Sequence, residues 1–135
     1  MPSLYEIAAQ ARNIHERLLA SSLGHTRTGG SCLYACILLS SMVEQFGSCT
    51  TVAIRGGDGK GDGGYRDASG AWHGHYWVEV DQDAGPVVLD ITADQFGGSG
   101  VVVCLADEAQ QYVAGDQNIV DAHVVSEKAC CQAVT

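Results

Sequence analysis

The spacing of apolar residues predicts two helices in the first third of the chain. Across residues 3–22 the apolar positions recur every three or four residues, which is typical of an amphipathic helix with one buried face. Ser3 and Glu6 have the spacing of a capping box at its start. Residues 32–46 (CLYACILLSSMVEQF) are apolar nearly all round, as in a helix buried at the centre of a fold, and Gly47 is a natural residue to end it.

The middle of the chain has the pattern of β-strands. Residues 50–55 form a β-branched run, residues 73–81 alternate between two faces, and residues 86–91 run back after a short turn. The last two segments predict an antiparallel hairpin. A further strand is expected at residues 101–105.

Two other segments are harder to assign. Residues 56–64 (GGDGKGDGG) contain six glycines in nine positions and predict a loop, either a flexible lid or an idle surface loop. Near the end, a strand is expected at residues 119–125 and a short helix at 126–133. Helices followed by an antiparallel sheet indicate an α+β fold, with the N-terminal helices packed on the sheet.

Length and charge limit the classes of protein. A chain of 135 residues fits one domain, here 1–135. A formal net charge of −9 disfavours nucleic acid and anionic membranes as partners, because both are bound through clustered Lys and Arg. No apolar run is long enough for a membrane span, and the first residues do not have the pattern of a signal peptide. We expect a cytoplasmic protein, or an effector secreted without a signal peptide.

Cysteine and histidine spacing gives little support for a metal site. The six cysteines lack the spacing of zinc ligands, and a domain of this size does not need disulfides, so a reducing compartment is the simpler expectation. His73 and His75 could chelate zinc with Cys32 as a third ligand, but no fourth ligand is evident. No metal and no cofactor are therefore expected.

The candidate chemistry centres on Cys32. A catalytic thiol reacts as the thiolate, and the first turn of a helix stabilises that negative charge. His75 opens a predicted strand and is the best candidate for the base. Asp90 lies in the returning strand of the predicted hairpin, where it would fall near His75 and orient its imidazole. The alternative is a core cysteine, a strand-end histidine and a turn-side acid.

Three stretches, GGSCLYACILLSSM, GHYWVEV and VVLDITADQFG, resemble the transglutaminase-like superfamily and together span residues 29–97. The resemblance implies a papain-like core with catalytic residues in the order Cys, His, Asp, carried here by Cys32, His75 and Asp90. The pattern also looks like arylamine N-acetyltransferases and lasso-peptide leader peptidases. Because Thr28 separates Arg27 from the glycine pair and the chain is short, acetyl-CoA chemistry is not expected.

The resemblance implies a cysteine enzyme that cleaves an amide bond of a protein or peptide through a thioacyl intermediate. A protease, an amidase or a glutamine deamidase fits, and compact domains of this kind occur as bacterial effectors or toxins. The alternatives are a protein-crosslinking transglutaminase and a binding module that retains the fold without activity. His25, Arg27 and Trp77 are candidate substrate-binding residues; solvent exposure alone is an equal alternative for His25 and Arg27, and for Trp77 a wall of the core or the cleft is favoured over a substrate platform.

Overall fold

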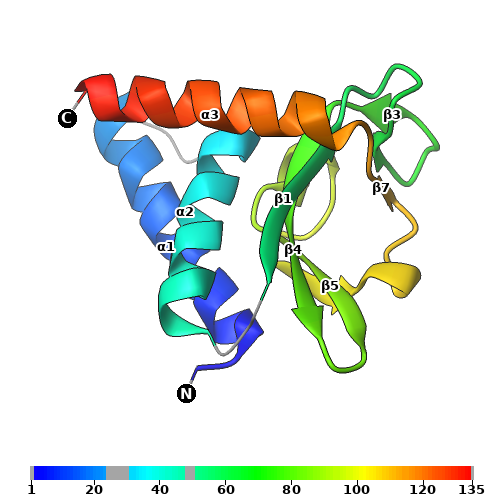
Figure 1. The fold of residues 1–135 in the computed structure, drawn as a ribbon, viewed down its shortest axis with the longest axis horizontal. Helices are drawn as coiled ribbons and strands as arrows, with labels where there is room; N and C mark the ends of the chain where they lie inside the picture. Colours follow the sequence, from blue (N-terminus) through cyan, green and yellow to red (C-terminus); the bar gives the residue numbers. More distant parts are fainter. Residues whose placement is uncertain (1, 24–30, 48–50, 135) are drawn as a thin grey trace.

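The computed structural model describes residues 2–23, 31–47 and 51–134 (Figure 1). Helices α1 (Leu4–Leu23) and α2 (Cys32–Phe46) run side by side against one face of a sheet, and helix α3 (Gln117–Val134) lies across one end of both. This arrangement confirms the α+β class and the packing of N-terminal helices on an antiparallel sheet.

The larger sheet has four antiparallel strands in the order β1-β4-β5-β6. Its members are β1 (Val52–Gly57), β4 (His75–Gln82), β5 (Gly85–Asp90) and β6 (Val102–Leu105). The predicted hairpin is formed by β4 and β5, with Val78 opposite Leu89. In this register Asp90 lies one residue beyond the last pair.

A smaller, unpredicted sheet has the order β3-β2-β7 and consists of β2 (Gly64–Arg66), β3 (Trp72–His73) and β7 (Tyr112–Val113). It changes one expectation. The predicted strand 73–81 is interrupted at Gly74, so His73 belongs to the small sheet and His75 to the large one. Short 3-10 turns η1 (Ala93–Phe96) and η2 (Ala106–Glu108) complete the fold.

The main core lies between the helices and one face of the large sheet. It consists of residues from α1, α2, α3 and the strands, among them Ile7, Ala11, Leu39, Val43, Val78, Val80, Leu89 and Val120. Alternation along β4 and β5 turns Trp77 and Val88 to the other face, where they pack with Ala109. His75 and Asp90 share the parity of these two residues and therefore lie on that second face.

Helix α1 begins with the predicted capping box. The backbone N–H of Glu6 donates to Ser3 Oγ at 3.1 Å, and the Ser3 N–H donates to Glu6 Oε1 at 3.3 Å. Helix α2 has the predicted bounds. The strand expected at 119–125 is wrong, because α3 covers these residues. Val120 is buried and Val124 packs on the same core, a spacing of four residues that suits a helix face better than a strand.

The glycine-rich segment contains a close approach of backbone to backbone. A Cβ on Gly57 would lie 2.2 Å from the backbone nitrogen of Gly64, where no side chain fits. The Gly59 N–H donates to the Gly63 carbonyl at 2.9 Å, and Gly63 has a φ of +77° that favours glycine. Part of the glycine content is therefore a steric requirement of the turn between β1 and β2.

Candidate functional site

The side chains of Cys32, His75 and Asp90 come together from three separate elements. Cys32 opens α2, His75 opens β4 and Asp90 ends β5. The His75 Nε2–H donates a hydrogen bond of 2.7 Å to Asp90 Oδ2, and both residues are buried. The Cys32 side chain is half-buried, and it lies close enough to the His75 imidazole to contribute to the raised pKa of that ring. The described structure thus brings together the three side chains that the sequence analysis singled out, with the hydrogen bond between His75 and Asp90 as their best-defined contact.

The Asp90 carboxylate accepts hydrogen bonds on both oxygens. Oδ1 accepts the backbone N–H of Thr92 at 2.9 Å and its hydroxyl at 3.3 Å. Oδ2 accepts the Tyr112 hydroxyl at 2.8 Å as well as the imidazole of His75. Four donors around one carboxylate compensate for its removal from water and fix its orientation. Both oxygens of the buried carboxylate therefore have hydrogen-bond partners.

The electrostatics of His75 favour its protonated form. Burial alone would lower its pKa, but hydrogen bonds to Asp90 and Cys32 and the nearby negative charge outweigh burial and raise the pKa from the usual 6.5 to about 9. Burial, and after it the negative charge of Asp90, raise the pKa of the Tyr112 hydroxyl. This hydroxyl therefore keeps its proton and stays a donor. The site is suited to hold an imidazolium at neutral pH.

Aromatic rings surround the imidazole. Phe96 and Tyr65 meet it edge to face at centroid distances of 5.1 and 5.7 Å, and Trp77 lies at 6.2 Å. Tyr112 packs against Trp77 at 5.2 Å. Such a shell excludes water and restricts the ring to one orientation, which strengthens every polar interaction that it makes.

Trp77 was expected to contact substrate, and the structure corrects this. Its side chain is only 1% exposed, and it belongs to the core cluster on the second face of the sheet. An indole covered by protein has no face open to a ligand. The other two expected substrate-binding residues, His25 and Arg27, lie outside the described residues.

His73 has a partner of its own. Its Nε2 lies 2.7 Å from Asp67 Oδ2, and its ring stacks on Phe96 at 4.3 Å. Hydrogen bonds from His73 first, and then from Ser69 and the Ala71 N–H, hold the pKa of Asp67 well below its usual range. Across residues 2–23, 31–47 and 51–134, no group of three or more His, Cys, Asp and Glu side chains could hold a metal ion. None of the helices in those ranges is long and apolar enough to cross a membrane.

Gln95 is a site residue that the sequence analysis missed. Its side-chain Nε2 lies 3.3 Å from Nδ1 of His75, the ring nitrogen that Asp90 leaves open. Gln95 sits in η1, directly after the strand that ends in Asp90. In the sequence, Gln95 is one polar residue at the start of the stretch QFGG. Nothing in the local pattern distinguishes it from an ordinary turn residue.

Arg12 on α1 fixes the turn that carries Gln95. Its guanidinium donates to Asp94 Oδ1 and Oδ2 at 2.8 and 2.9 Å and to the Ile91 carbonyl at 2.7 Å. The hydrogen bond with Asp94 is the main cause of the raised pKa of Arg12, with burial opposing it and Glu16 adding to it. A bidentate arginine–carboxylate pair restricts orientation as well as distance.

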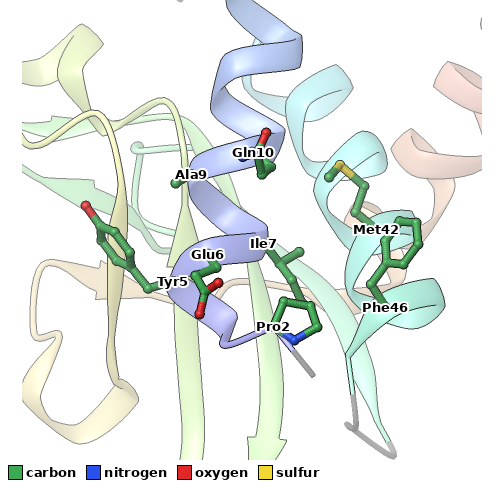
Figure 2. Close-up of a pocket in the computed structure, with 8 residues that line it drawn as sticks. All are labelled: Pro2, Tyr5, Glu6, Ile7, Ala9, Gln10, Met42 and Phe46. Carbon is green, nitrogen blue, oxygen red and sulfur yellow. The ribbon is translucent and has the colours of Figure 1, made fainter.

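A separate cavity lies away from these residues. It has a volume of about 390 Å³ and lies where the start of α1 meets the end of α2, with Met42 and Phe46 facing Pro2 and Ile7 (Figure 2). Its only acidic side chain, Glu6, is engaged in the capping box. This apolar groove shares no residue with the cluster around Cys32 and His75.

Comparison with known proteins adds no relative. No protein-family model matches the chain, and neither a curated protein nor a solved structure matches it significantly. The class that the fold and the site define is therefore an α+β protein with a buried His–Asp pair beside a half-buried thiol.

Proposed function

We propose that the chain is a cysteine-dependent enzyme that hydrolyses an amide bond through a thioacyl intermediate. One observation carries this proposal. A half-buried thiol at the first turn of a helix lies beside an imidazole whose Nε2 is bound to a buried carboxylate. A purely structural cysteine, histidine and aspartate do not require this order of contacts, whereas nucleophilic catalysis does.

The chemistry follows from the two nitrogens of His75. Because His75 is held as the imidazolium at neutral pH, its Nδ1 already carries the proton given up by Cys32 in the reactive state, and the Cys32 thiolate attacks the carbonyl carbon of the substrate amide. The imidazolium then gives this proton to the leaving nitrogen, the C–N bond breaks, and a thioester remains on Cys32. Water, activated by the same imidazole, hydrolyses the thioester and restores the thiol. Asp90 stabilises the imidazolium during both steps.

Gln95 and the start of α2 are suited to stabilise the oxyanion. The Gln95 amide lies beside Nδ1 of His75, close to where the attacked carbonyl develops its negative charge. The backbone N–H groups in the first turn of α2 carry a partial positive charge. They are in the same turn as Cys32, so they are suited to stabilise the negative oxygen that develops when its sulfur bonds to the carbonyl carbon. Two donors on opposite elements are the usual requirement for a tetrahedral intermediate.

Within this class, the papain-like and transglutaminase-like resemblance favours a protein or peptide substrate. Hydrolysis is preferred over amine transfer because so small a domain offers little room for a separate amine site. A glutamine side chain as substrate would make the enzyme a deamidase, and the peptide bond would make it a protease. Action as an effector, inside or outside the producing cell, belongs to the same proposal.

The first test is selective alkylation of the full chain by iodoacetamide at neutral pH, mapped by mass spectrometry. Cys104 is a matched control, since it is also a half-buried free thiol and burial raises its pKa. We expect Cys32 to react at least tenfold faster than Cys104. Equal rates would refute an activated thiol.

The second test identifies the reaction. An acylated Gln-Gly peptide and a denatured protein are incubated with the wild type and with Cys32→Ala, with and without a primary amine. A +1 Da product with release of ammonia indicates deamidation, peptide cleavage indicates a protease, and incorporated amine indicates transamidation. Cys32→Ala should abolish each of these while the thermal midpoint changes little. Activity that survives in Cys32→Ala would exclude the mechanism.

A further inference from the structure

A tyrosine from the small sheet shares one oxygen of Asp90 with His75. The Tyr112 hydroxyl donates to Asp90 Oδ2 at 2.8 Å, and the His75 Nε2–H donates to the same oxygen at 2.7 Å. The backbone N–H and the hydroxyl of Thr92 donate to the other oxygen, Oδ1. Tyr112 and His75 therefore compete for the negative charge on a single oxygen.

The fold holds the Tyr112 ring in place. Its backbone pairs with Tyr65 on β2, and its N–H donates to the Ala109 carbonyl at 3.0 Å. The rings of Tyr65 and Trp77 meet it nearly edge to face at centroid distances of 5.1 and 5.2 Å. A ring packed in this way has little freedom to turn, so its hydroxyl stays directed at Asp90.

The groups that can carry charge around this pair come from four elements. Those that face Tyr112 or His75 are Asp90 on β5, Cys32 on α2, Tyr65 on β2 and Cys104 on β6. Among them, Asp90 accepts a hydrogen bond from both side chains. The charge on Asp90 is therefore the route by which Tyr112 acts on His75.

We propose that Tyr112 is a positioning residue that moderates the hold of Asp90 on the protonated His75, so that the ring can release its proton during the reaction. The inference rests on the proposed function, since it concerns the base of the same site.

The physical reason lies in how the hydroxyl responds to the state of His75. A hydroxyl that donates to Oδ2 stabilises the negative charge there. This stabilisation is larger when His75 is neutral, because the imidazolium no longer compensates the carboxylate charge. Tyr112 thus favours the neutral imidazole over the imidazolium. The neutral ring is the form that can activate water for hydrolysis of the thioester.

The main test is the pKa of the His75 imidazole in Tyr112→Phe, followed by NMR and assigned by the loss of its signal in His75→Gln. Without the competing donor, Asp90 should hold the imidazolium more tightly, and the pKa of His75 should rise above the wild-type value by about half a unit to one unit. A merely structural role predicts the opposite sign. If loss of the hydroxyl only displaced Asp90, burial would lower the pKa of His75 toward 6.5.

Tyr65→Phe is the matched control. The Tyr65 ring lies 5.7 Å from that of His75, but its hydroxyl lies beside Gly98, where an added Cβ would be 3.0 Å away. This variant should leave the pKa of His75 unchanged. A rise as large as that in Tyr112→Phe would show that loss of any nearby hydroxyl has this effect, and it would overturn the specific role of Tyr112.

A second variant reverses the sign of the effect. 3-Fluorotyrosine at position 112 keeps nearly the same shape, but its more acidic hydroxyl donates more strongly to Asp90. The pKa of His75 should then fall below the wild-type value. If Tyr112→Phe does not fold, this variant decides alone, because an unchanged or higher pKa would contradict the proposal.

Hydrolysis of p-nitrophenyl acetate connects the pKa to the reaction. The Cys32 thiolate attacks the ester carbonyl, p-nitrophenolate leaves, and an acetyl thioester remains. Water then adds while His75 takes its proton, and acetate and the thiol are released. In Tyr112→Phe, the pH at which this second step reaches half of its maximal rate should move upward with the pKa of His75.

The outcomes separate the two proposals. If p-nitrophenyl acetate places no acetyl group on wild-type Cys32, the proposed function fails, while the titration of His75 still decides whether Tyr112 moderates the pair. If Cys32 is acetylated but Tyr112→Phe leaves the pKa of His75 unchanged or lowers it, the role of Tyr112 is overturned.

Discussion

The buried pair of His75 and Asp90 makes the stability of the fold depend on pH. The pKa of His75 is raised from the usual 6.5 to about 9, with burial opposed by the hydrogen bonds to Asp90 and Cys32. At about 1.4 kcal/mol per pH unit, this difference corresponds to about 3 kcal/mol of stabilisation of the protonated form. Because the folded protein binds the proton more tightly, this contribution is fully present below pH 6.5 and is lost as the pH rises through 9.

Asp90→Asn tests this magnitude. The variant keeps an acceptor for the Thr92 N–H but removes the negative charge beside His75. Burial of the imidazole is then opposed only by the contribution of Cys32, so the pKa of His75 should fall from about 9 toward 6.5. The free energy of unfolding should drop by about 3 kcal/mol at pH 6.5 and by much less above pH 9.

The assay is urea denaturation followed by tryptophan fluorescence at pH 6.5, 7.5 and 9.5, with the imidazole protons followed by NMR. The wild type should lose about 3 kcal/mol across this range, and Asp90→Asn should be nearly flat. His75→Gln is the control. Because it has no titrating ring, its free energy of unfolding should no longer fall with pH in the way the wild type does. An equal slope in wild type and both variants would show that the His75–Asp90 pair is not its source.

Three further variants test individual contacts through the free energy of unfolding. Tyr112→Phe removes the hydroxyl that donates to Asp90 at 2.8 Å and should cost about 2 kcal/mol; a change below 0.5 kcal/mol would contradict this. Arg12→Met breaks a bidentate pair and should cost about 2 kcal/mol, measured in urea at low and high salt. Gly57→Ala places a Cβ 2.2 Å from the Gly64 nitrogen and should cost more than about 2 kcal/mol, unless the loop can move without loss.

The parts of the fold that could be predicted are those that local pattern determines. Helix α2 has its predicted bounds because its apolar surface and Gly47 both act within a few residues. The β4–β5 hairpin follows from alternation and a short turn. The contact between His75 and Asp90 came from this same hairpin, although the register places Asp90 beyond the paired residues rather than opposite His75.

The remaining features depend on contacts between distant segments. Tyr112 reaches Asp90 from a two-residue strand of the second sheet, and β-pairing of such short segments leaves almost no trace in the sequence. The error at residues 119–125 has the same origin, because β-branched residues favour a strand locally and only packing against the core selects the helix. Nothing in the sequence pattern of α1 distinguishes His15 from other polar residues of the helix, because its partner Ser31 lies sixteen residues further on.

Helix α1 connects these distant parts of the site. Arg12 and His15 are three residues apart and so lie on one side of the helix, from which Arg12 binds the turn that holds Gln95 and His15 binds the residue before Cys32. A chain of 135 residues has few elements with which to hold two sides of the proposed reaction centre. If one rigid helix fixes both, then loosening α1 must lower the reactivity of Cys32 before the sheet unfolds, and the rate of thiol alkylation should respond to α1 substitutions that leave the His75–Asp90 pair intact.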